Sequence, residues 1–266
     1  MKNNLNGQVA FITGASSGIG AATAFALAKK GVKLALVARN EKKLKIVSKK
    51  INAMGGEAVY FLADIKEPDQ IQAAVDGTIE HYGKLDIACC NAGVYLRCPT
   101  PQLTMEQISS VMETNFYGNL NTAYAVLPYM QERHKGSIII TVSMDGKKGV
   151  PPDAAYVASK FALNGFFQVM RQEVRESGVH VGMLFPSRID TPMIENLDCP
   201  RVTPKASPKV MAKAIVKMVE RKKKEMMVPF FSCKLLTVAD EISPSLSDAL
   251  IRLLKLDGSE KRCHNI

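Results

Sequence analysis

Residues 8–31, QVAFITGASSGIGAATAFALAKKG, join a short apolar run to a glycine-rich turn and then to a helical pattern of small residues. Gly14, Gly18 and Gly20 fall at the turn, where the missing side chains allow a tight bend and a close approach of the backbone to a ligand. The helix that follows presents unpaired N–H groups and the positive end of its dipole. Together these features predict the first strand, turn and helix of a dinucleotide-binding fold.

Apolar β-rich runs recur along the chain with helical patterns between them. They cover residues 8–13, 32–38, 57–63, 85–90, 136–143, 180–185 and 225–230. Strands that are apolar along nearly their whole length are typical of a parallel sheet covered on both faces. We therefore expect an α/β fold with a Rossmann-type doubly wound parallel sheet, formed by one domain over residues 1–230.

The tail, residues 231–266, has a different pattern and predicts a C-terminal helical extension. Pro229 and Pro244 bracket the segment KLLTVADEIS, and the leucines of the next segment recur at helical spacing. They are Leu246, Leu250, Leu253 and Leu254. This single apolar stripe predicts an amphipathic helix that packs on the parent domain or on a neighbouring subunit. The alternative is contact with a membrane surface.

The composition favours a soluble globular protein and gives little support to a nucleic-acid partner. The chain has 266 residues, 47% of them apolar, and a formal net charge of +10. The densest basic runs, at 41–50 and 221–224, fall within expected helices and are interpreted as solvated helix faces. No nucleic-acid-binding motif accompanies them, so we expect no nucleic-acid partner.

The cysteines and the N-terminus bear on location. The six cysteines, Cys89, Cys90, Cys98, Cys199, Cys233 and Cys263, show no C-x-x-C spacing, and we assign no metal ligands. Cys89 and Cys90 lie in an apolar run and are expected in the core. The N-terminus lacks the pattern of a signal peptide, and no run of about eighteen apolar residues predicts a membrane span. We expect a cytoplasmic protein with reduced thiols.

The end of the second apolar run bears on the choice of dinucleotide. An acidic residue at this position would bind the ribose 2′-hydroxyl, but the sequence LVARNEKK places Arg39 there, with no carboxylate before Glu41. A guanidinium suits a 2′-phosphate through charge-assisted hydrogen bonds and stacking on adenine. We therefore predict NADP(H) over NAD(H). The alternative is that Arg39 is only a surface loop residue.

The stretch AAYVASKFAL, residues 154–163, places Tyr156 and Lys160 four residues apart, on one face of an expected helix. Alone, such a pair could be two snorkelling side chains on an amphipathic helix. However, of the seven tyrosines only Tyr156 has a lysine four residues later. The rest of the chain decides between the two interpretations.

These motifs together resemble the short-chain dehydrogenase/reductase family from residue 8 to about 230. TGASSGIG matches the family's glycine motif, Asp64 its adenine-contacting aspartate, and NAG at 91–93 its strand-four motif. Asn115, Ser143, Tyr156 and Lys160 match its catalytic tetrad. The cofactor contacts that the resemblance implies are Gly14, Ser16, Ser17, Gly18, Ile19, Gly20, Arg39, Asp64, Ile65, Asn91, Ala92, Gly93, Tyr156, Lys160, Pro186, Ser187, Ile189 and Thr191.

The resemblance also implies a chemistry: hydride transfer between a nicotinamide and a carbonyl carbon or an alcohol. Tyr156 would be the general acid or base, and a positive Lys160 is expected to lower its pKa from about 10. Ser143 would hydrogen-bond the substrate oxygen. Asn115 would hold a water that connects Lys160 to solvent.

The sequence departs from the family pattern at two positions. Pro186 is followed by Ser187 where the family usually has glycine, which adds a side chain beside the expected nicotinamide pocket. Cys90 stands where many members have asparagine, and we expect little effect from it.

Substrate contacts in this family come from variable segments, which here are residues 93–99, 144–150 and 187–205. They mix apolar side chains with the basic residues Arg97, Lys147 and Lys148. We therefore expect a moderately apolar ketone or aldehyde, or the corresponding alcohol. Three prolines punctuate the last segment, which is expected to be a mobile lid over the ligand.

Three other functions stay open. A 3-oxoacyl thioester reductase could receive an acidic carrier protein on the basic surface, although the tail beyond residue 230 argues against it. A lipid or sterol ketone reductase could be recruited to membranes by the tail. A dinucleotide sensor without turnover would not need the intact tetrad.

Members of the family are mostly homodimers or homotetramers, and the expected helix around Tyr156 bears on this point. Its apolar side chains exceed what one sheet face needs, which agrees with a homo-oligomer. They are Phe161, Leu163, Phe166, Phe167 and Met170.

Overall fold

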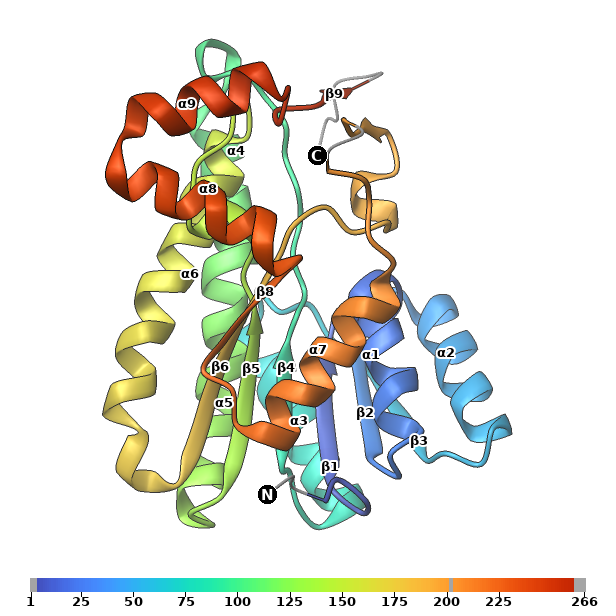
Figure 1. The fold of residues 1–266 in the computed structure, drawn as a ribbon. Coiled ribbons are helices and arrows are strands. Elements are labelled where there is room, and N and C mark those ends of the chain that lie inside the picture. The colour runs from blue at the N-terminus through green and yellow to red at the C-terminus, as the bar shows by residue number, and fades with distance from the viewer. Residues whose placement is uncertain (1–3, 201–202, 261–266) are drawn as a thin grey trace.

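Seven strands form one parallel sheet in the order β3-β2-β1-β4-β5-β6-β8, in a computed structural model that describes residues 4–200 and 203–260 (Figure 1). The strands are β1 (Val9–Thr13), β2 (Lys33–Ala38), β3 (Ala58–Leu62), β4 (Ile87–Cys90), β5 (Gly136–Thr141), β6 (Val179–Pro186) and β8 (Glu225–Val228). Each falls within or next to one of the seven apolar runs. The doubly wound parallel sheet predicted from the sequence is therefore confirmed.

Helices cover both faces of this sheet. The helices are α1 (Gly18–Ala28), α2 (Glu41–Ala53), α3 (Pro68–Tyr82), α4 (Met105–Met112), α5 (Gly118–Glu132), α6 (Ala154–Glu173), α7 (Pro208–Arg221), α8 (Phe230–Ile242) and α9 (Pro244–Leu253). One core cluster joins α1, α2 and α7 to the sheet, and the other joins α3, α5 and α6 to its opposite face. Neighbouring residues of β1 alternate between the clusters, Ile12 in one and Phe11 in the other.

The basic run at 41–50 behaves as the sequence analysis predicts. Asn40 caps α2 by accepting a hydrogen bond from the Lys43 N–H at 3.0 Å. Leu44, Val47 and Ile51 are buried along one face, whereas the lysines of α2 are exposed. The charged run is thus the solvated face of an amphipathic helix.

The strand order reverses between β1 and β4, and this point locates the site. β1 pairs with β2 on one side and with β4 on the other, so the connections after these strands diverge. Ligands of open α/β sheets bind at such a switch point, outside the carboxyl ends of the strands. The glycine turn after β1 and the NAG motif after β4 both lie there.

The leucine stripe of the tail is only partly covered by the parent domain, and its packing on that domain or on a neighbouring subunit stays a prediction. Helix α9 is present, but its buried residues are Ser247 and Ile251, while Leu246 and Leu253 are 48% and 77% exposed. Apolar periodicity shows that one face of a helix is apolar, and it does not show what covers that face. Residues 261–266, including Cys263, lie outside the described part of the chain.

Helix α8 has a similar outward stripe. Phe231, Leu235 and Ile242 recur at helical spacing and are 86%, 68% and 75% exposed, whereas Cys233 and Thr237 are buried on the other side. In Figure 1 the two helices lie together, in red, above the end of the sheet. No helix among the described residues is long and apolar enough to cross a membrane.

The surplus apolar surface expected on α6 is smaller than predicted. Leu163, Phe167 and Met170 are buried against the sheet, so they belong to the core. Phe161 is exposed, and Phe166 packs edge-on against Phe116 at the border of the core. Cys89 and Cys90 are buried in β4, as expected.

Candidate active site

One cavity of about 540 Å³ brings together almost all of the residues that the sequence singled out. The expected cofactor residues that line it are Gly14, Ser16, Ser17, Gly18, Ile19, Arg39, Asp64, Ile65, Asn91, Ala92, Gly93, Tyr156, Lys160, Pro186, Ser187, Ile189 and Thr191. Ser143 lines it as well. Gly20 and Asn115 do not, and their places in the structure are described below.

The glycine turn is shaped by steric limits on the backbone. Gly14 has a φ of +65°, and a Cβ there would lie 3.0 Å from the Ala92 Cα. Gly18 also has a positive φ, at +53°. A Cβ on Gly20 would collide with the carbonyl oxygen of Gly14, so Gly20 serves the close packing of α1 on the turn and does not line the cavity.

The N-terminus of α1 fits a phosphate group. Its N-cap residue, Ser17, makes no side-chain capping hydrogen bond, and its first turn has no acidic residue. The first N–H groups of a helix lack partners within the helix, and the dipole makes this end positive. With the cavity at this terminus, the turn can receive the pyrophosphate of a dinucleotide.

The ends of three strands are joined beside this turn. The Thr13 hydroxyl oxygen accepts hydrogen bonds from the N–H groups of Asn91 and Ala92 at 3.0 and 3.2 Å. The Thr141 hydroxyl donates to Asn91 Oδ1 at 3.3 Å. The NAG motif is thereby fixed between β1 and β5, on the floor of the cavity.

Arg39 and Asp64 lie together at the other end of this half of the cavity. The guanidinium Nη1 is 3.6 Å from Asp64 Oδ2, and the side chain of Arg39 is 66% exposed. Such an exposed pair contributes little to stability. The guanidinium can therefore turn toward an anionic ligand at small cost.

Tyr156 and Lys160 lie side by side on α6, as the spacing predicts. Lys160 Nζ lies 5.4 Å from the centre of the Tyr156 ring and donates to the Thr141 carbonyl oxygen at 3.2 Å. Lys160 is only 4% exposed. The loop after β5 brings Ser143 to the same wall, where its Oγ lies 3.0 Å from Asp145 Oδ2.

Asn115 lies behind this wall, in a π-helical turn (Glu113–Tyr117) between α4 and α5. Its side-chain amide donates to the Val94 carbonyl oxygen at 2.9 Å and to Ser159 Oγ at 3.0 Å. Its Oδ1 accepts from the Val94 N–H at 2.8 Å. Asn115 therefore ties the π-helical turn to α6 and to the loop after β4, and its role in holding a water stays a prediction.

The expected lowering of the Tyr156 pKa is wrong for the protein by itself. Burial raises the pKa of Tyr156 above its ordinary value of 10, and the nearby Asp145 adds to the rise, while a hydrogen bond with Ser143 opposes it. Burial also lowers the pKa of Lys160 to about 8, against the effect of Asp145. The reason is that both side chains share one dehydrated wall, where desolvation penalises each charged form.

Beside Tyr156 lie Tyr95 and Arg97, from the variable segment 93–99, and Asp153, which the sequence analysis did not identify. The Tyr95 ring meets the Tyr156 ring edge to face, with centroids 5.0 Å apart. The Tyr95 hydroxyl donates to Asp153 Oδ2 at 2.7 Å, and Arg97 Nη1 lies 3.7 Å from Asp153 Oδ1. These contacts hold the Tyr95 ring beside the expected reaction centre.

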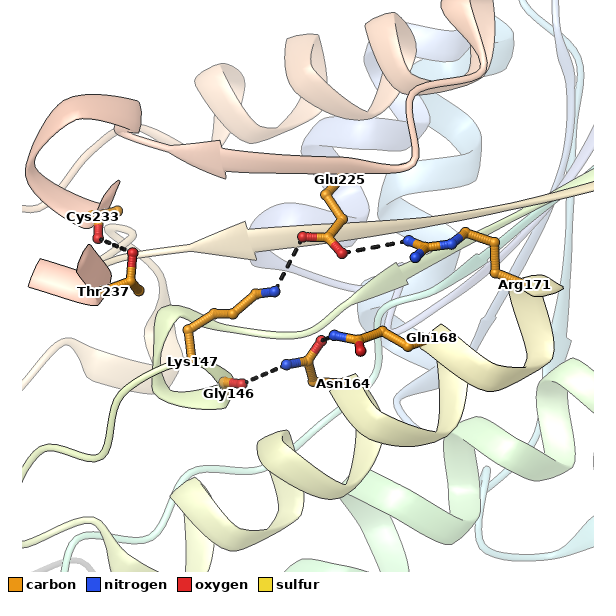
Figure 2. Close-up of polar contacts among 8 residues, drawn as sticks. All are labelled: Gly146, Lys147, Asn164, Gln168, Arg171, Glu225, Cys233 and Thr237. Carbon is orange, nitrogen blue, oxygen red and sulfur yellow. Dashed lines mark hydrogen bonds and ion pairs between the residues drawn. The ribbon is translucent and has the colours of Figure 1, made fainter. Parts of the chain in front are cut away.

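The basic residues of the variable segments are bound within the protein and are not free for an anionic substrate. Figure 2 shows Lys147 reaching Glu225 on β8, with Nζ 3.1 Å from Oε2, while Arg171 of α6 reaches the other oxygen at 3.4 Å. The Asn164 amide donates to the Gly146 carbonyl oxygen at 2.9 Å. The loop that carries Ser143 is thus fixed to both α6 and β8.

Helices α8 and α9 form a roof over the other half of the cavity. Leucines of this segment line the cavity, namely Leu235, Leu236, Leu250, Leu254 and Leu256. Lys148 Nζ holds the roof through Asp240 at 2.8 Å and Asp248 at 2.9 Å. Arg97 donates to the carbonyl oxygens of Asp257 and Gly258 at 2.8 and 3.1 Å. Arg188 donates to that of Leu256.

Ser187, which replaces the usual glycine, faces this roof. Burial raises the pKa of the Cys233 thiol on α8 to about 11, and hydrogen bonds with Ser232 and Ser187 oppose the rise. The Ser187 N–H meanwhile donates to the Val228 carbonyl oxygen at 2.9 Å. The added side chain therefore contacts α8.

The expected lid, residues 187–205, is described except for Arg201 and Val202. It contains a short strand, β7 (Leu197–Asp198), that pairs with β9 (Ser259–Glu260) antiparallel to it. Ile189 forms an isolated bridge with Ala206. The mobility of this segment stays a prediction.

Comparisons with known proteins agree with this geometry. The family model described as short chain dehydrogenase matches residues 8–200. An uncharacterized oxidoreductase of Listeria innocua is 36% identical over 195 residues, which are 73% of this chain and 79% of that protein. The ketoacyl reductase HetN of a Nostoc species is 30% identical over 270 residues, covering 98% of this chain and 94% of HetN.

A solved structure has a similar fold. The alcohol dehydrogenase of the archaeon Thermococcus sibiricus, complexed with 5-hydroxy-NADP, superposes with a TM-score of 0.74 at 26% identity, covering 83% of this chain and 95% of that one. Fold and site define a nucleotide-binding oxidoreductase with a Rossmann-type sheet. The chain belongs to the short-chain dehydrogenase/reductase family.

Sequence reasoning located these contacts only in part. Tyr95, Asp145 and Arg188 fall in the three variable segments expected to contact the substrate, but their own contacts were not predicted, and Asp153 lies outside all three segments. The one available signal was Asp145, a carboxylate two residues after Ser143. A charged residue so close to an expected catalytic hydroxyl invites attention.

Proposed function

We propose that the protein is an NADP(H)-dependent oxidoreductase that interconverts a carbonyl and a secondary alcohol on a moderately apolar substrate. One observation carries the proposal: Ser143, Tyr156 and Lys160 line one cavity together with the glycine turn of its dinucleotide half and the leucines of its other half. The first half has the steric and electrostatic features of a pyrophosphate site, and the second suits an apolar molecule.

The proposed chemistry divides between the cofactor and the chain. The bound nicotinamide supplies or accepts the hydride. Tyr156 exchanges a proton with the substrate oxygen, and Ser143 fixes that oxygen. Lys160, buried and cationic below about pH 8, favours the phenolate once the proton has left.

The protonation state of Tyr156 favours the direction of reduction. A phenol with an ordinary pKa near 10 already keeps its proton at neutral pH, and burial, which raises the pKa of Tyr156, keeps the proton in place, whereas oxidation of an alcohol needs the phenolate. We therefore expect carbonyl reduction to be faster than alcohol oxidation at pH 7. Initial rates in both directions on one substrate pair test this expectation.

The proposed substrate class follows from the side chains that line the leucine-rich half of the cavity. Beside the roof leucines, Met144, Met193 and Leu197 contribute apolar surface, and Lys148 is held by the roof carboxylates. A panel of aliphatic, aromatic and polyhydroxylated carbonyls with NADPH separates the possibilities. Turnover of small sugars alone would contradict the proposed class, and no turnover of any carbonyl would contradict the proposed function.

The cofactor preference rests on Arg39. Its exposed guanidinium lies at the adenine end, with only a loose ion pair to Asp64. We expect kcat/KM with NADPH to exceed that with NADH, and Arg39→Ala to lower the NADPH value about tenfold while sparing NADH. Lys45 on α2, already paired with Glu41, provides the control substitution Lys45→Ala. An NADH preference in the unmodified protein would overturn this part.

Reduction of a 3-oxoacyl thioester is a second candidate, and one observation favours it. HetN, named a ketoacyl reductase, matches over 98% of this chain. That match includes the tail, so the tail no longer argues against such a substrate. Comparison of a carrier-bound 3-oxoacyl thioester with a simple ketone of equal chain length discriminates between the two.

A lipid or sterol ketone delivered from a membrane surface is a third candidate. Leu235 and Leu254 are both exposed on the roof and part of the cavity lining, so the apolar surface continues into the cavity. Co-sedimentation with liposomes tests it. Indifference to lipid would remove this candidate.

A homo-oligomer is also proposed, on the outer face of α5 and α6. Tyr124 and Phe161 are exposed there, 57% and 43%, with Tyr117 and Val169 near them in sequence. Analytical ultracentrifugation determines the subunit number. A Tyr124→Glu variant that leaves the mass unchanged would place the interface elsewhere.

A further inference from the structure

Tyr95 and Arg97 face the cavity from one short segment after β4. Both line the cavity, whereas Leu96 between them is 1% exposed and packs with Val111 and Ala155. Side chains of an extended chain point alternately to opposite sides, so the burial of Leu96 directs its two neighbours toward the cavity. The packing of Leu96 therefore fixes where Tyr95 and Arg97 lie.

The Tyr95 ring forms the part of the cavity wall next to Tyr156. Its centroid is 5.0 Å from the centroid of the Tyr156 ring, and the two ring planes meet at 87°. Edge-to-face packing at this distance leaves no space for another group between the rings. The position of the Tyr95 ring therefore limits the space beside the proposed proton donor.

A buried carboxylate holds the Tyr95 ring in this position. The Tyr95 hydroxyl donates to Asp153 Oδ2 at 2.7 Å, and the side chain of Asp153 is 8% exposed. A phenol with an ordinary pKa of about 10 keeps its proton at neutral pH, so the hydroxyl is able to donate. Hydrogen bonds to an ionised acceptor are stronger than those between neutral groups. The ring is thus restrained at one end by the main chain and at the other by Asp153.

Asp153 does not cap the helix that it precedes. It is the N-cap residue of α6, the helix that carries Tyr156, and its side chain accepts no hydrogen bond from the first turn of that helix, all of which the structure describes. Asn40, the N-cap residue of α2, does accept such a bond. An aspartate at this position ordinarily stabilises the helix by capping it. The carboxylate of Asp153 is directed to Tyr95 instead, which indicates a role at the cavity.

Arg97 links this pair to the C-terminal segment. Its Nη1 is 3.7 Å from Asp153 Oδ1 and donates to the Asp257 carbonyl oxygen at 2.8 Å. Its Nη2 donates to the Gly258 carbonyl oxygen at 3.1 Å. A planar guanidinium donates to several oxygens in fixed directions, which an ammonium group does not do. The main chain after α9 is thus joined, through one side chain, to the carboxylate that holds Tyr95.

We propose that Tyr95 is a specificity-determining residue, whose ring, fixed beside Tyr156, admits a ketone with one slim substituent and excludes a branched group at that place. Asp153 and Arg97 are positioning residues that act through Tyr95. The inference rests on the proposed function, because it names which moderately apolar carbonyls the site accepts. The C-terminal segment contributes to this selection through its carbonyl oxygens.

The selectivity between two ketones tests the role of Tyr95. The probes are a methyl ketone and the isopropyl ketone of the same alkyl chain, each with NADPH, and the readout is the ratio of their kcat/KM values. Tyr95→Ala opens space beside Tyr156, so the methyl-to-isopropyl ratio should fall at least about tenfold. Tyr95→Phe keeps the ring but loses the bond to Asp153, so the ratio should fall about two- to fivefold.

The ratio separates positioning from a merely structural role. A protein that is only destabilised loses rate with both ketones alike, so its ratio does not change. A ratio that stays the same in Tyr95→Ala would overturn the proposal.

Lysine at position 97 tests the link to the C-terminal segment. Arg97→Lys keeps a charge beside Asp153 but loses the geometry that serves two carbonyl oxygens, so the ratio should fall about twofold. In a Tyr95→Ala background the same substitution should not change the ratio. A further fall there would show that Arg97 contacts the substrate itself, against its positioning role.

Arg133→Lys is the matched control for Arg97→Lys. The Arg133 guanidinium also joins a main-chain carbonyl oxygen, that of Leu85, to a carboxylate, that of Asp86. Arg133 is not among the described residues that line the cavity. The methyl-to-isopropyl ratio of this variant should equal that of the unmodified protein.

A measurement without substrate tests the hold on Tyr95 separately. Tyr95→Phe leaves a buried carboxylate without this donor, so the melting temperature should fall by at least about 3 °C. Tyr129→Phe is the matched control, since its hydroxyl donates to Asp76 at the same distance of 2.7 Å but at an exposed site. It should lower the melting temperature by less than about 2 °C. Equal shifts would show that Asp153 does not hold Tyr95 as proposed.

The failure of this inference and the failure of the proposed function give different results. If the unmodified protein turns over no carbonyl, the proposed function fails and the selectivity fails with it, while the melting temperatures still show whether Asp153 holds Tyr95. If both ketones are turned over but Tyr95→Ala leaves their ratio unchanged, the inference is overturned and the proposed function stands.

Discussion

The glycine turn after β1 and the roof of α8 and α9 close the same cavity by different means. At the turn, Gly14 needs a positive φ and Gly20 has no room for a Cβ, so the main chain itself sets the shape. The roof is held by long side chains, chiefly Lys148 with Asp240 and Asp248, and its outer faces are apolar and exposed. Substitutions should therefore have large effects at the turn and small effects at the roof.

The largest effect is expected where the two regions meet, at Tyr156. Tyr156→Phe removes the proposed proton donor and should lower kcat by about 10²- to 10⁴-fold, while NADPH binding, followed by its fluorescence, stays unchanged. Tyr129→Phe, which removes a remote hydroxyl bonded to Asp76, is the control. A Tyr156→Phe enzyme within threefold of the unmodified rate would refute the proposed chemistry.

The steric half of the comparison is tested by two alanine substitutions in helices. Gly20→Ala places a methyl group against the Gly14 carbonyl oxygen and should cost about 1–3 kcal/mol of unfolding free energy. Gly165→Ala, on the exposed side of α6 with nothing within 4 Å, should stabilise by up to about 1 kcal/mol. Urea unfolding measures both. Equal effects would show that helix propensity, not the close approach, governs Gly20.

This contrast explains how much could be predicted from the sequence. Glycines at fixed spacing after an apolar strand predict a tight turn, and the four-residue spacing of Tyr156 and Lys160 predicts a shared helix face. The structure has both. The leucine stripe predicted helix α9 correctly, but it did not show that Ser247 and Ile251 would be the buried residues of the helix. The contact of Ser187 with Cys233 depends on a tertiary arrangement that no local pattern contains.

The pKa of Tyr156 shows the same limit at a single residue. The spacing of Tyr156 and Lys160 predicts that they are neighbours, which the structure confirms. The net effect on the pKa depends on burial and on Asp145, and both follow from how distant segments enclose the site. The sequence thus predicts that the two residues are neighbours, but it does not predict the net shift of the Tyr156 pKa.

The ion pairs that hold the roof are expected to affect substrate binding more than the rate of the chemical step. Lys148→Ala removes two ion pairs, each worth roughly 0.2–1 kcal/mol because the carboxylates are partly exposed. We expect KM for an apolar ketone to rise about two- to fivefold with little change in kcat. Lys234→Ala, on the exposed side of α8, is the control. A fall in kcat at constant KM would place Lys148 in the reaction step.

The smallest effect on the unfolding free energy is expected from substitutions in the outward-facing apolar stripes of α8 and α9. Phe231 and Leu253 are 86% and 77% exposed and do not line the cavity, so replacing both by serine should change the unfolding free energy of the isolated chain by less than about 0.5 kcal/mol per site. Ile251→Ser, on the inward face of the same helix, should cost about 2–4 kcal/mol.

The outward pair also reports whether this surface is covered in solution. A stripe that stays in water leaves kcat/KM for a water-soluble ketone within about twofold and the subunit number unchanged, because these side chains are largely exposed to solvent. If the double variant instead loses subunits or unfolds, another chain buries the stripe, and the roof is then held from both sides. In that case only substitutions in the ion pairs of the roof should have small effects. Substitutions in the apolar stripe should then have effects as large as those at the glycine turn.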